Sequence, residues 1–192
     1  MIAFDDYARQ AGQELDLDVG AILVARDAYP RLDVGEQLGR LDALAEPLPL
    51  RLGSLPAEEA VATMTRYLYQ ELGFRGNEAE YGDPRNSYLS DVLERRLGIP
   101  ITLALVFLAV ARRRGVKAHG VSFPGHFLVR VERPRGGPLV VDPFHGRTLL
   151  LANVETMLRR TAGPDAKLGP EHLCPAAHRA ILVRMLQNLK AA

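Results

Sequence analysis

The stretch from Ile99 to Ala111 constrains the fold more than any other part of this chain. Its side chains are apolar nearly all round a helix, so a helix here needs cover on every side. Pro100 suits the first turn of such a helix, where its missing N–H is not needed. The stretch is too short to cross a bilayer, and arginines flank both of its ends. We therefore expect a buried central helix and no membrane partner.

The pattern changes after Gly115, where β-branched and aromatic residues alternate with turn residues. Strands are predicted at 116–123, 127–131 and 139–141, and the last two form a hairpin. Helices are predicted at 54–72, 86–97, 151–160 and 181–189, after two or three short helices near the N-terminus. A buried helix followed by antiparallel strands predicts an α+β domain in which the helix lies across one face of a small sheet.

The predicted hairpin brings a histidine and an aspartate together. If the turn is centred near Arg135, paired residues have numbers that sum to about 270, so Asp142 lies opposite Leu128 and diagonal to His126. A carboxylate beside an imidazole orients the ring and stabilises its protonated form, as a general base requires. His126 and Asp142 are therefore a candidate catalytic pair. A histidine–carboxylate bond that only satisfies two partly buried polar groups is an equally good interpretation.

Four separate motifs carry a resemblance to a known family. They read DPRNSYL at 83–89, LERRLGIPI at 93–101, FPGHFLVR at 123–130 and VDPF at 141–144. In this order they resemble the SirB-type transglutaminase-like family. The resemblance implies a transglutaminase-like (papain-like) core with a helical N-terminal part, at 1–162. It also implies a linker and C-terminal helix at 163–192, similar to the start of a tetratricopeptide-like helical repeat region.

Active enzymes of this superfamily place a cysteine at the start of the central helix, followed by the histidine and the aspartate. The resemblance assigns these last two roles to His126 and Asp142. The cysteine position falls near Pro100 to Thr102, where there is no thiol. Thr102 is the substitute nucleophile to consider, although a hydroxyl is far less acidic than a thiol and would depend on His126. Its alternative role is that of a first-turn residue bonded to the local backbone.

Candidate ligand-binding residues surround the second predicted helix. Asn86, Ser87 and Asp91 belong to the family-like motifs and are expected either to cap that helix and face solvent, or to reach the His126 cleft and bind a ligand. His145 follows Asp142 in a turn and is expected at the rim of the same cleft.

The lone cysteine, Cys174, excludes an intrachain disulfide and lies outside the family order of catalytic residues, so it is expected to be a small buried thiol. His172, Cys174 and His178 offer at most three ligands without a zinc-like spacing. We expect no metal and no cofactor.

Charge excludes a general attraction to polyanions, because 24 basic residues face 23 acidic ones. The acidic start of the chain argues against export, and a cytoplasmic protein is expected. Nucleic acid is not an expected partner, since basic residues are not interleaved with aromatics. The sequence thus favours a non-catalytic, regulatory module that binds a protein or peptide. The alternatives are a hydrolase or acyl transferase that uses His126 and Asp142 with water or Thr102, and a purely architectural module.

Overall fold

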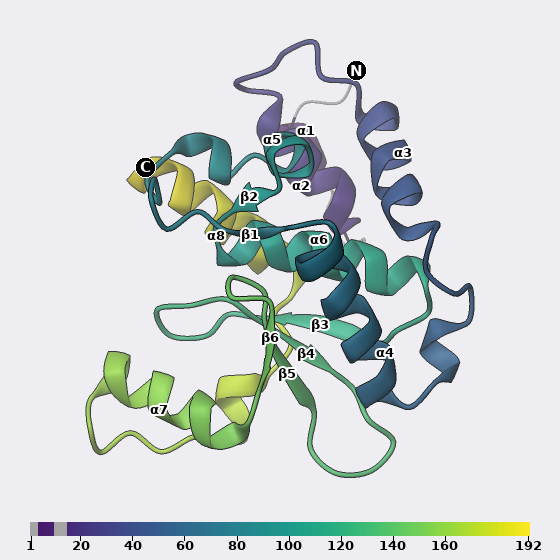
Figure 1. Ribbon diagram of the computed structural model, residues 1–192. Helices are drawn as coiled ribbons and strands as arrows, with labels where there is room; N and C mark the ends of the chain where they lie inside the picture. Colours follow the sequence, from purple (N-terminus) through teal and green to yellow (C-terminus); the bar gives the residue numbers. More distant parts are fainter. Residues whose placement is uncertain (1–3, 10–14) are drawn as a thin grey trace.

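The computed structural model describes residues 4–9 and 15–192, so part of the acidic chain start lies outside it. The α-helices of these residues are α1 (Phe4–Ala8), α2 (Leu17–Ala25), α3 (Val34–Ala45), α4 (Ala57–Thr65), α5 (Leu89–Arg95), α6 (Pro100–Arg113), α7 (Leu151–Ala162) and α8 (His178–Ala191). The strands are β1 (Arg75–Gly76), β2 (Leu97–Gly98), β3 (Ala118–Val121), β4 (Leu128–Val131), β5 (Leu139–Asp142) and β6 (Arg147–Leu149). The architecture is α+β, as the sequence predicts, and Figure 1 shows its arrangement.

Helix α6 is the predicted central helix. Every residue from Pro100 to Ala111 is buried, and Pro100 occupies the first turn. The helix packs on strands β3 and β4 and against helices α2, α3 and α5. The apolar side chains on all sides of α6 are shielded from water, because the sheet and the helices together enclose it.

The main sheet is antiparallel in the order β3-β4-β5-β6. Val129 pairs with Val141 and Arg130 with Val140, so the predicted register of the hairpin is confirmed. Successive side chains point to opposite faces of a strand. Val129 and Val141 belong to the core that contains α6, whereas Leu128 and Val140 pack with the residues of α7. The sheet therefore separates α6 from α7, which lies apart from the other helices in Figure 1.

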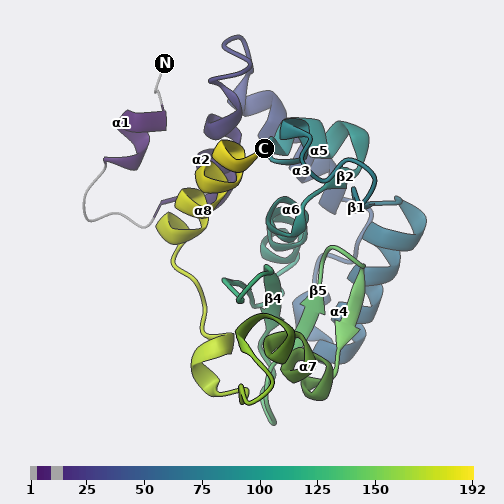
Figure 2. The same ribbon diagram turned by 90° about the vertical axis from the view of Figure 1, so that its left-hand side faces the viewer.

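The C-terminal helix packs against the N-terminal part of the chain. Figure 2 shows α8 running beside α2, and the two helices are in contact. Ile181, Leu182 and Met185 of α8 are buried in the same core as α6. The boundary at 162/163 stays a prediction, and the segment after it shares the core of the segment before it.

Several elements differ from the sequence prediction. Strand β6 and the two-residue parallel pair β1–β2 were not predicted, because two or three residues carry no readable alternation. The helix expected at 54–72 is α-helical only to Thr65 and continues as a π-helical turn over Arg66–Glu71. The helix expected from Asn86 begins at Leu89, after a 3₁₀ turn over Pro84–Asn86.

Candidate functional site at the end of the hairpin

The two polar residues of the hairpin meet as predicted. The ring nitrogen Nε2 of His126 lies 2.9 Å from Oδ1 of Asp142, a hydrogen-bonding distance. Asp142 ends strand β5 and is fully buried, while 14% of the His126 side chain is exposed. The other ring nitrogen of His126, Nδ1, has no hydrogen-bond partner among the described residues. One nitrogen is thus fixed by the carboxylate and the second is free for another partner.

A second imidazole occupies the other oxygen of the same carboxylate. Nδ1 of His145 lies 2.6 Å from Oδ2 of Asp142. The backbone N–H groups of Phe144 and His145 also donate to Oδ1, at 3.1 and 3.4 Å. Burial raises the pKa of Asp142, but the hydrogen bonds and positive charge of the two histidines outweigh it and hold the pKa at about 2. Asp142 is therefore a carboxylate at any physiological pH.

The two histidines border a hollow of about 240 Å³ on the α7 side of the sheet. Its lining is Pro124, Gly125, His126, Asp142, His145, Arg147, Met157, Arg160 and Thr161. Arg147 is 62% exposed and its Nε lies 3.9 Å from Oδ2 of Asp142. Arg160 is exposed at the end of α7 and has no carboxylate partner among the described residues. The buried carboxylate thus lies beneath a rim that carries two guanidinium groups.

Comparison with protein-family models identifies the family of the chain. The model of the transglutaminase-like superfamily matches residues 36–187, well over half of the chain. The chain belongs to this superfamily.

Several relatives are UPF0162 proteins. One from Xylella fastidiosa strain Temecula1 is 45% identical over 191 residues, which cover 97% of this chain and 68% of the relative, so the chain belongs to the UPF0162 family. Another, from strain 9a5c, is 45% identical over 182 residues, and the match covers 92% of this chain but only 64% of that relative. YchA of Escherichia coli is 31% identical over 169 residues, 88% of this chain and 62% of YchA. No solved structure matches the chain significantly.

The nucleophile position of this transglutaminase-like chain is closed. Thr102, in the first turn of α6, is fully buried, and its hydroxyl lies 2.7 Å from the carbonyl oxygen of Asn86 and 3.1 Å from that of Ile99. The same hydroxyl accepts the N–H of Ile99 at 3.2 Å. The bonding to local backbone that the sequence suggested is therefore confirmed. No residue of α6 is among those that line the His126 hollow, so the structure does not bring Thr102 into it.

The prediction that Cys174 is buried was wrong. This cysteine is exposed, and its sulfur makes only a 3.5 Å contact with the carbonyl oxygen of Pro170. It follows the 3₁₀ turn Pro170–Leu173, in which Leu173 rather than the cysteine turns into the core. It does not line the hollow beside His126. The neighbouring His172 and His178 bond separately, to Gly169 and to the carbonyl oxygen of Leu15.

Asn86 holds a loop rather than capping a helix. Helix α5 has Tyr88 at its N-cap, without a side-chain bond, so the capping role suggested for Asn86 or Ser87 was wrong. The fully buried Asn86 side chain donates to the carbonyl oxygens of Glu80 and Tyr81 and accepts from Asn77. Tyr81 in turn packs edge-on against Phe144, next to the two histidines. Asn86 and the buried Ser87 do not line the hollow itself.

Asp91 lies in a different hollow. It accepts a hydrogen bond from the Tyr29 hydroxyl at 3.2 Å, and burial raises its pKa despite that bond. It borders a cavity between α3 and α5 that shares no residue with the His126 hollow. The structure therefore brings His145 to His126 and Asp142, but not Asp91.

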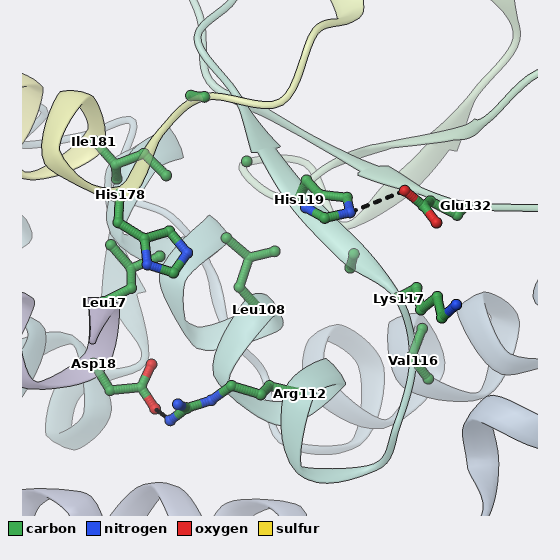
Figure 3. Close-up of a pocket in the computed structure, with 13 residues that line it drawn as sticks. Leu17, Asp18, Leu108, Arg112, Val116, Lys117, His119, Glu132, His178 and Ile181 are labelled. Atoms are coloured by element: carbon green, nitrogen blue, oxygen red, sulfur yellow. Dashed lines mark hydrogen bonds and ion pairs between the residues drawn. The ribbon is translucent and has the colours of Figure 1, made fainter. Parts of the chain in front are cut away.

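A further cavity, of about 400 Å³, lies where β3, α6, α2 and α8 meet (Figure 3). Leu17, Leu108 and Ile181 form part of its wall, and its charged residues largely pair with one another. Arg112 bonds to Asp18, and His119 lies 3.1 Å from Glu132. None of the four family-like motifs contributes a residue to this cavity, so the His126 hollow is the stronger candidate site.

Four residues near His126 were missed by the sequence reasoning. Arg160 and Thr161 come from α7, whose position over this end of the sheet depends on packing far away in the sequence. Arg147 belongs to the unpredicted β6. Tyr69 packs its ring against Gly146, with its hydroxyl buried and unpaired, and burial together with the negative charge of Asp142 raises its pKa. The hairpin register would have placed Arg147 near Asp142 if β6 had been recognised, because the two residues are paired.

Proposed function

We propose that this chain binds a protein or peptide segment in the hollow at His126 without transferring acyl groups, and that the segment carries an acidic side chain. One observation carries the proposal. The hydroxyl at the start of α6 is fully buried and bound to backbone, where an active transglutaminase-like enzyme has its thiol. The dyad remains and the nucleophile does not, which favours binding over catalysis.

The charge of the rim supports the acidic partner. Arg147 and Arg160 are exposed, and the only carboxylate among the residues of the hollow is the buried Asp142. Asp142 already accepts hydrogen bonds from two imidazoles and two backbone N–H groups. Guanidinium groups bind carboxylates in pairs of parallel hydrogen bonds. An aspartate or glutamate side chain of the partner would give Arg160 a counterion, and would give Arg147 a closer one than Asp142 at 3.9 Å.

The test uses a peptide selected from a random library on the purified chain. Its affinity is measured by fluorescence anisotropy beside that of the same peptide with asparagine or glutamine at each acid. Arg160→Gln should weaken binding of the acidic peptide about fivefold or more, as for a charged contact of about 1 kcal/mol. Arg159→Gln is the matched control, because Arg159 is the neighbouring arginine on α7 but bonds to Glu155. Equal losses of affinity in the two arginine variants would refute the proposal. Selected peptides that bind away from His126 would refute it as well.

A second candidate function rests on the free nitrogen of His126. Since Nε2 is held by Asp142 and Nδ1 is unbonded, the ring can accept a proton from water and act as a general base in hydrolysis. Thr102 is a weaker acceptor of the acyl group than water here, because it is buried. Turnover of ester and glutamine-amide substrates is compared between wild type, His126→Ala and His119→Ala. Activity lost only in His126→Ala supports hydrolysis and overturns the binding-only proposal, whereas no turnover in any of the three eliminates hydrolysis of these substrates.

A further inference from the structure

His126, Asp142 and His145 share one small volume. One ring nitrogen of each histidine and one carboxylate oxygen all lie within 4.8 Å of one another, and no other such cluster of three was found among the described residues. We propose that these three residues form a binding site for a divalent transition metal ion such as Zn²⁺. This inference concerns the ion alone and does not depend on a peptide binding in the hollow.

The donor set selects the class of ion. Two imidazole nitrogens and one carboxylate oxygen are ligands for zinc and for iron(II), cobalt(II) and related ions, whereas calcium and magnesium prefer oxygen ligands alone. Zinc lies about 2.0 to 2.2 Å from such atoms and holds them near tetrahedral angles, so two ligand atoms on one ion are about 3.3 to 3.6 Å apart. Ligand atoms within 4.8 Å of one another therefore need to approach by up to about 1.5 Å. His145 has the freedom to make this movement, because 43% of its side chain is exposed.

The residues around the three ligands are arranged as supports. The backbone N–H groups of Phe144 and His145 hold the carboxylate of Asp142, and the Phe144 ring packs edge-on against both imidazoles. The far nitrogen of His145, Nε2, lies 4.0 Å from the Glu78 carboxylate. A ligating histidine commonly donates its other N–H to a carboxylate, and a rotation of the exposed Glu78 side chain would bring it within that reach. When the ion replaces the ring-to-carboxylate hydrogen bonds, each neutral imidazole carries its proton on the other nitrogen, which for His145 is the one beside Glu78.

The open side of the cluster gives the ion a route in. The three ligands face the 240 Å³ hollow, so coordination positions remain for water or for an anionic group. Arg147 and Arg160 oppose a cation by charge repulsion, but Arg147 is 62% exposed and water screens its effect. The same two arginines would hold an anionic ligand against the ion. The structure thus assigns a site with three protein ligands, and its affinity should rise when the charge at Arg147 is removed.

The experiment uses the full chain without a histidine tag. Binding of Zn²⁺ is measured by competition with a chromophoric chelator, and Co²⁺ supplies an absorption spectrum that reports nitrogen and oxygen ligands. We expect one ion per chain. His145→Ala should weaken binding by at least about tenfold, the lower range seen when even an indirect metal contact is removed. Its exposed position makes it tolerant of substitution, and His126→Ala is the second variant.

Controls separate this cluster from other donors. His119→Ala, which removes a histidine paired with Glu132 in the same sheet, and Cys174→Ala should leave the affinity unchanged. Arg147→Gln should raise the affinity for Zn²⁺ by about two- to fivefold, because a nearby positive charge is removed. Absence of stoichiometric binding, binding that is lost in a control variant instead, or inorganic phosphate binding with no metal binding would each overturn the proposal. The peptide proposal would be unaffected, because its test compares peptide affinity in Arg160→Gln and Arg159→Gln and involves no metal ion.

Discussion

The sheet carries two histidine–carboxylate pairs that differ in almost everything except their chemistry. His119 and Glu132 lie 3.1 Å apart at one edge, with 41% and 44% of their side chains exposed. His126 and Asp142 lie 2.9 Å apart with 14% and 1% exposed, and only the second pair has another imidazole on its carboxylate. Distance alone does not make a site. Burial and extra donors turn one of two similar contacts into a group with a strongly shifted pKa.

The largest difference between the two pairs is expected when the carboxylate of each is removed. Asp142→Ala leaves two imidazoles and two backbone N–H groups without their acceptor, and should lower the free energy of unfolding by about 3 to 5 kcal/mol. Glu132→Ala removes an exposed pair and should lower it by less than about 1 kcal/mol. Urea denaturation of both variants checks the difference. Equal losses would mean that burial does not distinguish the two pairs.

The acid stability of the fold gives a second contrast. The folded-state pKa of Asp142 is about 2, below the unfolded value, so its carboxylate stabilises the fold above about pH 4 and this contribution is lost as the pH falls through 2. Between pH 5 and pH 2, wild type should therefore lose about 2 kcal/mol relative to Asp142→Asn. Urea denaturation of the two proteins at several pH values measures it. A constant difference across this range would contradict a depressed pKa.

The residues around the same pairs show which parts of the site could be predicted from the sequence. The His126–Asp142 contact was predictable, because a turn centre near Arg135 fixes the register and side chains two residues apart share a face. The role of His145 was visible only as nearness to Asp142 in a turn. The positions of Arg160 and Thr161 could not be predicted from the sequence. Helix α7 reaches this end of the sheet because Val154 and Leu158 pack on the face of the sheet opposite α6. The register of strands is a local rule, whereas the placement of a helix over a sheet is not.

The second imidazole is the next point at which the pairs differ. His145→Ala removes one donor to Asp142 but leaves His126 in place, and the exposed side chain limits the loss of stability to about 1 kcal/mol. The pKa of Asp142 should rise, because one hydrogen bond and one positive charge are lost. Carboxyl carbon chemical shifts, titrated in wild type and variant, report that pKa directly. If it stays at the wild-type value, His126 and the backbone alone account for the shift.

The smallest expected effect concerns Tyr69, which belongs to the surroundings of the buried pair His126 and Asp142. Its ring packs against Gly146, but its hydroxyl is buried without a partner near the negative charge of Asp142. Tyr69→Phe keeps the ring and removes the unsatisfied group, so it should raise the free energy of unfolding by about 1 kcal/mol. Tyr67→Phe is the matched control in the same π-helical turn. The Tyr67 hydroxyl donates a hydrogen bond to the carbonyl oxygen of Leu44 at 3.0 Å. Loss of this bond should lower the free energy of unfolding by a similar amount. Opposite signs in the two thermal melts would show that the polar groups beneath Asp142 are not all satisfied. A loss of stability in Tyr69→Phe would instead mean that this hydroxyl has a partner, such as an ordered water bridging it to the carboxylate.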